Sequence, residues 1–277
     1  MKLNIKNLIR YIIKPQYFIG KIKFNLSNPI HKNKINNTSF SRIYHFHIRK
    51  CGGTSFNTAF SKFPNGNSKN YQIVASSHEN KAIFKNIPIV GWNLRHLKRG
   101  DFWYGFSHIE FERIFPLKKN TFTFSFLRDP IDRLLSHYNM IKDWEINNSS
   151  HPAFEKEGRW LGNSFSEFLE KIPKQHLQNQ LFMFSNNFDI NTALKNLKTI
   201  DFVGLVGRDE EKLLNYFREV FDINLDYFHT RKSKFNYKVD KKEMNLLINK
   251  LEDEIIFFEK AKLYIVKNLK NFKIKKY

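Results

Sequence analysis

Alternation of apolar and polar side chains predicts β-strands in two segments of the chain. In residues 43–48, His45 and His47 alternate with apolar residues. In residues 121–126, three phenylalanines alternate with small hydroxylated residues, at Phe122, Phe124 and Phe126. A period of two residues is that of a strand, because successive side chains point to opposite faces. Each segment ends at residues typical of a helix start, so the pattern predicts two strand-to-helix units.

A helix is predicted directly after the second strand. Asp129 is suited to cap it, and Pro130 at the first helical position has no N–H that would need a partner. Arg133 and Ser136 are then expected on the polar face of this helix, so that Arg128 and Ser136 can meet one ligand near its start. Four apolar residues at helical spacing form the core-facing stripe: Ile131, Leu134, Leu135 and Tyr138.

Helical periodicity recurs in the later part of the chain, in residues 164–171, 175–184, 210–221 and 241–270, the last as one long helix or two shorter ones. The polar stretch 25–41 is typical of a linker. We therefore expect a basic N-terminal helix and linker in residues 1–41, and a single domain with a helical C-terminal end in residues 42–277. Its fold class should be α/β, with three layers and a central, mainly parallel sheet flanked by helices.

The segment Lys50-Cys51-Gly52-Gly53-Thr54-Ser55 follows the first predicted strand and has the composition of an anion-binding turn. Two glycines allow the backbone to turn tightly and bring its N–H groups close to an oxyanion. The helix that follows adds its positive end and two hydroxyls, and Lys50 adds a charge. This turn differs from a nucleoside-triphosphate loop, in which the lysine follows the last glycine. The sequence predicts a phosphate site.

Together, these six residues and the segment from Arg128 to Tyr138 resemble the sulfotransferases that use 3'-phosphoadenosine 5'-phosphosulfate (PAPS). The likeness is greatest to the carbohydrate branch related to heparan sulfate 2-O- and 6-O-sulfotransferases and their bacterial relatives. That family has H-x-P-K-T-G-G-T-S after one strand and F-x-R-D-P-x-x-R-x-x-S-x-Y after a later one. This chain has Arg49 where the family usually has proline and Cys51 where it has threonine. The likeness runs from about residue 44 to about residue 222.

The resemblance implies a P-loop-like fold and a role for each matching residue. The loop of Lys50, Cys51, Gly52, Gly53, Thr54 and Ser55 would hold the 5'-phosphosulfate. Arg128 and Ser136 would hold the 3'-phosphate, and the basic loop with Arg231 and Lys232 lies roughly where relatives close over the nucleotide. The implied reaction is in-line transfer of a sulfuryl group to a hydroxyl, which the likeness to the carbohydrate branch favours as that of a carbohydrate, with 3',5'-adenosine bisphosphate (PAP) as product and no metal required.

Sulfuryl transfer to a hydroxyl needs a base, and Lys50 is expected to stabilise the leaving group. We predict that His108 is this base, because the segment around it resembles the one in which the 2-O- and 6-O-enzymes carry their proposed catalytic histidine. An ordinary imidazole pKa of about 6.5 suits a base near neutral pH. Glu110 and His78 remain alternatives, the latter after the apolar stretch 73–75, where it could lie on the open edge of a sheet. Packing explains His45 and His47 better than catalysis does.

A formal net charge of +21 indicates that the surface attracts anions, but it does not identify them. An acidic acceptor, the nucleotide, an anionic lipid surface and nucleic acid all fit the charge. The alternatives are therefore a nucleic-acid or anionic-surface binding protein, or a nucleotide-dependent kinase, although the chain has no Gly-Lys-Ser/Thr. We expect a carbohydrate or other hydroxyl acceptor and no nucleic acid, and leave the oligomeric state open.

The single cysteine, Cys51, excludes an intramolecular disulfide. In an electropositive loop at a helix start its thiol is expected to have a lowered pKa, without being the nucleophile. Residues 1–24 lack the apolar run of a signal peptide and the longer run of a membrane span. We therefore expect a cytoplasmic enzyme, with peripheral contact at the inner membrane surface as an alternative for the basic, amphipathic N-terminal segment.

Overall fold

A computed structural model of the protein describes residues 39–228 and 233–270. Six strands form one sheet in the spatial order β2-β3-β4-β1-β5-β6. All neighbouring strands are parallel except β2 and β3. This arrangement confirms the predicted α/β fold with a mainly parallel sheet. The strands are β1 (Arg42–Phe46), β2 (Lys81–Phe84), β3 (Ile87–Gly91), β4 (Tyr104–Ser107), β5 (Thr121–Leu127) and β6 (Phe202–Leu205).

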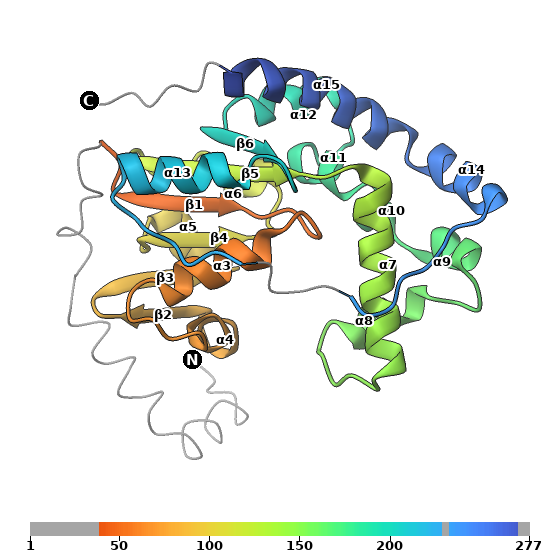
Figure 1. Cartoon of the computed structure of the whole chain (residues 1–277), viewed down its shortest axis with the longest axis horizontal. Coiled ribbons are helices and arrows are strands. Elements are labelled where there is room, and N and C mark those ends of the chain that lie inside the picture. The colour runs from red at the N-terminus through yellow and green to blue at the C-terminus, as the bar shows by residue number, and fades with distance from the viewer. Residues whose placement is uncertain (1–38, 229–232, 271–277) are drawn as a thin grey trace, which may run out of the picture.

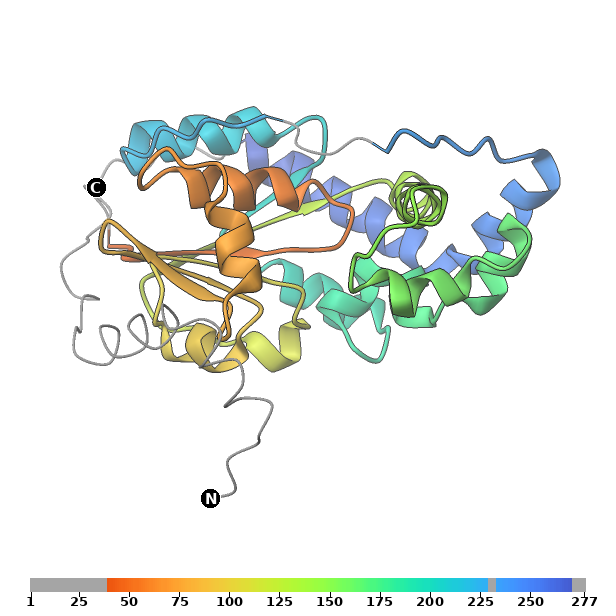
Figure 2. The same cartoon turned by 90° about the horizontal axis from the view of Figure 1, so that it is seen from below.

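Helices cover both faces of the sheet, which gives the three predicted layers (Figures 1 and 2). On one face lie α3 (Gly53–Lys62) and α13 (Glu210–Val220), where the rings of Phe60 and Phe217 have centroids 5.1 Å apart. On the opposite face lie α5 (Leu94–Arg99) and α6 (Phe111–Ile114), where Phe46 of β1 contacts Phe111. A short helix, α4 (Asn70–Ser76), packs beside β2 and β3.

The strand β5 is buried on both faces, and its hydroxylated side chains form hydrogen bonds within the core. All seven residues of β5 are buried, so the hydroxyl side is not a solvent face. Ser125 Oγ donates to the carbonyl of Phe46 at 2.7 Å, and Thr123 Oγ1 donates to Asp201 at 2.7 Å. Each buried hydroxyl thus has a partner, which removes most of the cost of taking it out of water.

Most of the remaining helices extend to one side of the sheet, toward the right of Figure 1, and pack around a second hydrophobic cluster, which includes Tyr138, Phe168 and Leu251. These helices are α7 (Pro130–Ile146), α8 (Phe154–Glu157), the 3-10 helix η2 (Gly158–Trp160), α9 (Phe165–Lys171), α10 (Lys174–Leu177) and α14 (Lys241–Lys250). The helices α11 (Asn179–Phe184) and α12 (Ile190–Leu197) belong instead to the core of the sheet, where Phe184 of α11 contacts Phe46 of β1. The long helix α15 (Glu252–Lys270) runs from the helical part back across β6.

The structure differs from the predicted helix in one segment and decides the form of another. The predicted helix 175–184 is two short helices, because Gln178 has φ −102° and ψ 53° and ends the first one. The segment 241–270 takes the two-helix form, with a break at Leu251. The apolar stretch 73–75 before His78 is helical and belongs to α4, so it does not form a strand.

The predicted N-terminal helix lies before residue 39, outside the described residues. Within residues 39–228 and 233–270, no helix combines the length and apolarity needed to cross a bilayer.

Candidate active site

The turn between β1 and α3 is shaped by its two glycines. Gly52 has φ +74°, in the left-handed region that glycine adopts without strain. A Cβ on Gly53 would lie 1.9 Å from the ring of His47, so only glycine lets the helix start pack against that ring. Lys50 also has a positive φ, of 65°, a conformation that costs a non-glycine residue about 1–3 kcal/mol and recurs at ligand sites.

The start of α3 is open to an anion. Its first turn has no side-chain cap and no acidic residue, so no side chain of the helix neutralises its first N–H groups. Thr54 is half-buried and Ser55 is buried in this first turn. These are the properties expected of a helix end that binds a phosphate or sulfate.

The second corner joins β5 to α7. Asp129 caps the helix as predicted, because its Oδ1 accepts hydrogen bonds from the backbone N–H groups of Ile131 at 2.9 Å and Asp132 at 3.1 Å. Arg128, directly before this cap, and Ser136, in the second turn of α7, are both half-buried. β1 and β5 are neighbours in the sheet, so the two corners lie side by side. Arg128 donates from a guanidinium nitrogen to the carbonyl of Lys50 at 3.5 Å.

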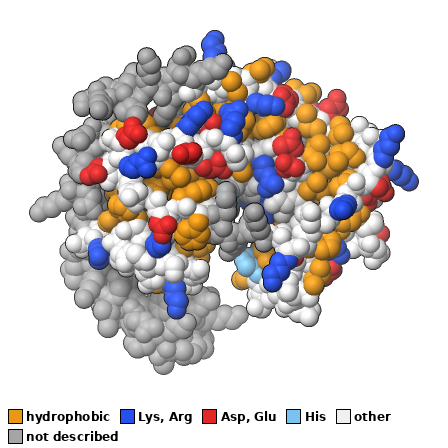
Figure 3. All heavy atoms as spheres, viewed as in Figure 1, with side chains coloured by type: hydrophobic (Ala, Val, Ile, Leu, Met, Phe, Trp, Pro, Cys, Tyr) orange, Lys and Arg blue, Asp and Glu red, His pale blue; other side chains and the backbone are white. Residues whose placement is uncertain are grey.

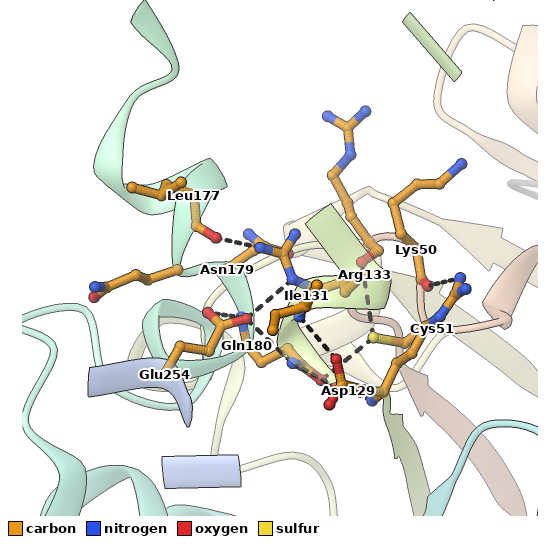
Figure 4. Close-up of polar contacts among 12 residues, drawn as sticks. Lys50, Cys51, Asp129, Ile131, Arg133, Leu177, Asn179, Gln180 and Glu254 are labelled. Carbon is orange, nitrogen blue, oxygen red and sulfur yellow. Dashed lines mark hydrogen bonds and ion pairs between the residues drawn. The ribbon is translucent and has the colours of Figure 1, made fainter. Parts of the chain in front are cut away.

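Gln180, at the start of α11, holds both corners together (Figure 4). Its Oε1 accepts from the backbone N–H of Arg128 at 2.8 Å and lies 3.5 Å from the Cys51 sulfur. Its Nε2 donates to the carbonyl of Arg128 at 2.9 Å and to Glu254 at 3.1 Å. The side chain thus fixes the backbone of Arg128 from both sides. The helical periodicity of residues 175–184 gave no sign of this role for Gln180.

Glu254 of α15 lies behind Gln180 and is fully buried with Arg133. Arg133 donates from Nε to Glu254 Oε1 at 3.0 Å and also to the carbonyl of Leu177. The backbone N–H of Gln180 donates to Glu254 Oε2 at 3.1 Å. The expectation that Arg133 lies on an exposed polar face was therefore wrong, since a buried carboxylate provides its partner.

Cys51 also differs from expectation. Its side chain is buried beneath the loop and faces Gln180, so its sulfur does not face the side of the loop on which Lys50 extends (Figure 4). Burial raises the pKa of the thiol to about 12, against the smaller opposing effect of the Arg133 charge. The thiol is therefore protonated, and Cys51 contributes packing and a backbone position to the loop.

His108 follows β4, and its orientation is fixed by β1. Its Nδ1 lies 2.6 Å from the carbonyl of His47, and a carbonyl only accepts, so Nδ1 carries the proton. Nε2 of the neutral ring consequently keeps its lone pair. The ring also packs on that of His47, with centroids 4.2 Å apart, and His47 contacts Gly53. The ring of His47 thus lies between His108 and the open start of α3.

The surroundings of His108 keep it neutral. Burial lowers its pKa to about 4, and the positive charge of Arg49 acts in the same direction. His45 and His47 are buried and share Asn57, which accepts from His45 Nδ1 at 2.9 Å and donates to His47 Nδ1 at 3.2 Å. These two histidines have packing and hydrogen-bonding roles, in line with the sequence interpretation.

The two alternative bases have different positions. Glu110 directly precedes α6, and its carboxylate lies 3.2 Å from the guanidinium of Arg113, with which it forms an ion pair. His78 is exposed in the turn before β2, at the outer edge of the sheet. Of the two, only Glu110 lines a cavity of about 230 Å³ that also includes His108. The structure therefore brings His108 and Glu110 together and leaves His78 apart.

The cavity lies against Arg49, whose role the sequence did not indicate. Arg49 donates two hydrogen bonds to Glu157, at 2.6 and 2.8 Å, and His137 Nε2 donates to the same carboxylate at 2.9 Å. Burial would raise the pKa of Glu157, but the hydrogen bonds of His137 and Arg49 outweigh it and lower the pKa to about 2. Arg49 and Glu157 therefore form a charged pair at all physiological pH values.

Of the predicted site residues, the structure brings together the loop 50–55, Arg128, Ser136 and His108 at the carboxyl ends of β1, β4 and β5. Arg231 and Lys232 lie outside the described residues. A hollow separates the sheet part from the helical part on the face shown in Figure 3, with histidine atoms exposed at its edge. Among the described residues of that face, lysines and arginines are spread between acidic residues and form no single basic patch.

Comparison with known proteins identifies the family. A family model described as the sulfotransferase family matches residues 33–261, which is most of the chain. No curated protein matches the chain. The matched region contains both corners, the turn with His108, and Gln180 with its partner Glu254. The chain therefore belongs to the sulfotransferase family.

Proposed function

We propose that this sulfotransferase uses PAPS as donor and transfers its sulfuryl group to a hydroxyl of a carbohydrate. The observation that carries the proposal is the position of two anion-binding corners side by side, with a neutral histidine next to one of them. A donor with phosphate groups at both ends of one nucleoside needs two such corners. The uncapped start of α3 with Lys50 suits the 5'-phosphosulfate, and Arg128 with Ser136 suits the 3'-phosphate.

In this mechanism the acceptor oxygen forms a bond to sulfur while the bond from sulfur to the 5'-phosphate oxygen breaks. Nε2 of His108 takes the proton of the attacking hydroxyl. Lys50 and the first N–H groups of α3 stabilise the negative charge that develops on the departing phosphate oxygen. The chain contributes position and charge, as enzymes do in the related phosphoryl transfers.

Binding of PAP tests the donor. We expect PAP to raise the melting temperature of the protein, and ATP with magnesium to raise it much less. Arg128→Ala should increase the dissociation constant for PAP roughly 10- to 100-fold, as expected for loss of charge-assisted hydrogen bonds. Lys50→Ala should lower kcat by about 10²–10³ with PAPS, since it removes a group that stabilises developing charge.

Lys62→Ala is a matched control for both variants. It removes the same charge at the opposite end of α3, where Lys62 pairs with Asp226. We expect its PAP affinity and kcat to stay close to those of the wild type. Wild-type PAP binding and turnover in Lys50→Ala and Arg128→Ala would show that the two corners do not hold the donor.

Gln180→Leu should weaken PAP binding although Gln180 is not placed to contact the nucleotide. The leucine removes both hydrogen bonds to the Arg128 backbone, each worth about 1 kcal/mol net, so we expect the dissociation constant to rise about tenfold or more. Calorimetric titration with PAP measures it.

Gln178→Leu is the control for Gln180→Leu, because Gln178 is also buried and donates to the carbonyl of Lys250, away from both corners. It should lower thermal stability while PAP affinity stays unchanged. Equal losses of PAP affinity in the two variants would assign Gln180 a purely structural role.

A further inference from the structure

We propose that the cavity beside His108 binds the acceptor, and that it selects a single neutral, polyhydroxylated ring over an acidic one. This inference rests on the proposed function and adds the class of the second substrate. It runs against the net charge of the chain, which by itself favours an acidic acceptor. The preference follows from the size of the cavity, from its charge, and from the hydrogen-bonding groups that line it.

The cavity is formed between two separate parts of the fold. The turn from β4 to α6 contributes His108 and Glu110, and Arg49 comes from the turn between β1 and α3. Its volume of about 230 Å³ is below the roughly 300–1,000 Å³ of pockets that enclose drug-sized ligands. A single sugar ring matches this size better than several linked rings do. The opposite wall consists of residues of α10 and α11: Gln175, His176, Asn179, Phe182 and Met183.

The charges that line the cavity are already balanced. Arg49 is bound by both oxygens of Glu157, and Glu110 is paired with Arg113. Burial lowers the pKa of His108 and of His176 to about 4 in each case, so both rings are neutral near pH 7. A carboxylate or sulfate on the acceptor would therefore meet no uncompensated cation among the described residues of the lining. It would have to compete with Glu157 for Arg49, and desolvating it would be costly.

The polar atoms of the lining suit hydroxyl groups. Asn179 is only 5% exposed, and its Nδ2 donates to the carbonyl of Gln175 at 2.9 Å. Its Oδ1 has no hydrogen-bond partner within the described parts of the chain, which is unfavourable for a buried amide until a donor reaches it. The Nε2 lone pair of His108 and the carboxylate of Glu110 are further acceptors. Hydroxyls can donate to all three, while Phe182 and Met183 offer an apolar surface to the C–H groups of a ring.

The test compares acceptors that differ only in charge. Methyl glycosides of glucose, galactose and mannose are paired with the corresponding methyl uronides, in which a carboxylate replaces the hydroxymethyl group. Initial rates with PAPS give kcat/KM for each. We expect the best neutral glycoside to exceed its uronide at least about tenfold, because the carboxylate is desolvated without a free cation. Equal or higher values for the uronides overturn the proposal, as does turnover of neither class by protein that binds PAP.

Two variants connect the preference to the cavity. Asn179→Leu should raise KM for the neutral glycoside about tenfold and leave PAP affinity unchanged. Glu157→Gln keeps the shape of the side chain but releases the charge of Arg49, so the ratio of kcat/KM between uronide and neutral glycoside should rise about tenfold. If neither variant changes these quantities, the cavity does not bind the acceptor. Absence of PAP binding in the wild type would instead refute the proposed donor, and both proposals with it.

Discussion

Replacement of His108 by alanine is expected to lower kcat by about 10²–10⁴, the usual contribution of a positioned base. The reason is the arrangement of the ring, whose Nδ1–H is held by the carbonyl of His47 at 2.6 Å while Nε2 keeps its lone pair. PAP affinity should change little, because the ring lies beside the donor site and is not part of either corner. Steady-state rates with PAPS and saturating acceptor, together with PAP titration, measure the two effects separately.

His108→Asn separates chemistry from structure. Asparagine can still donate a hydrogen bond to the carbonyl of His47, but its amide nitrogen cannot accept a proton. We expect it to be as inactive as alanine and closer to the wild type in stability. Recovery of activity in His108→Asn would mean that the ring only supports the turn, and Glu110→Gln would then be the next variant. His78→Ala, on the outer edge of the sheet, should remain fully active.

The pH dependence of kcat/KM follows from the same environment. Because burial and the charge of Arg49 lower the pKa of His108 to about 4, the free enzyme holds the neutral base well below pH 6. Activity due to this group should therefore stay constant from pH 8 down to about pH 5 and fall only as the pH approaches 4. An ordinary histidine would lose activity around pH 6.5. A fall centred near that value would contradict the assignment of this group as the base.

The sequence was informative wherever the determining interactions are local. The cap of α7 depends on Asp129 and two N–H groups within three residues of it, and both are present as predicted. In the first corner, Gly52 acts through its own φ angle, and Gly53 acts through its contact with His47, which is only a few positions earlier. Short-range rules therefore suffice to shape each corner. The position of the two corners side by side depends on the pairing of β1 with β5, which are far apart in the sequence, and only the family resemblance indicated that both hold one ligand.

Interactions between distant segments could not be predicted in the same way. Arg133 has its carboxylate 121 residues away on α15, so helical periodicity placed it on the wrong face. Cys51 is covered by Gln180, 129 residues later, and the expected reactive thiol is in fact protonated and buried. The break at Gln178 has a similar origin, since its side chain reaches the carbonyl of Lys250 in α14. In each case the deciding partner comes from the C-terminal half.

Glu254→Ala is expected to destabilise the protein by about 3–5 kcal/mol, which is a large part of a typical total stability of roughly 5–15 kcal/mol. Glu254 and Arg133 are both 0% exposed, so removal of the carboxylate leaves a guanidinium charge buried without its counter-ion. The same change removes the acceptor of two Gln180 hydrogen bonds. We therefore expect PAP affinity to fall as well. Urea unfolding with an unchanged slope measures the loss of stability.

Glu259→Ala, on the same helix, is the matched control for Glu254→Ala. Glu259 pairs with Lys262, and both side chains are about half exposed, so water compensates for the loss and the cost should be under about 1 kcal/mol. Replacing both buried partners, as in Arg133→Met with Glu254→Leu, should recover much of the stability lost in Glu254→Ala, because no charge stays buried. PAP affinity should not recover, since leucine cannot bind Gln180. If Glu254→Ala cost no more than Glu259→Ala, the buried pair would not connect α15 to the donor site.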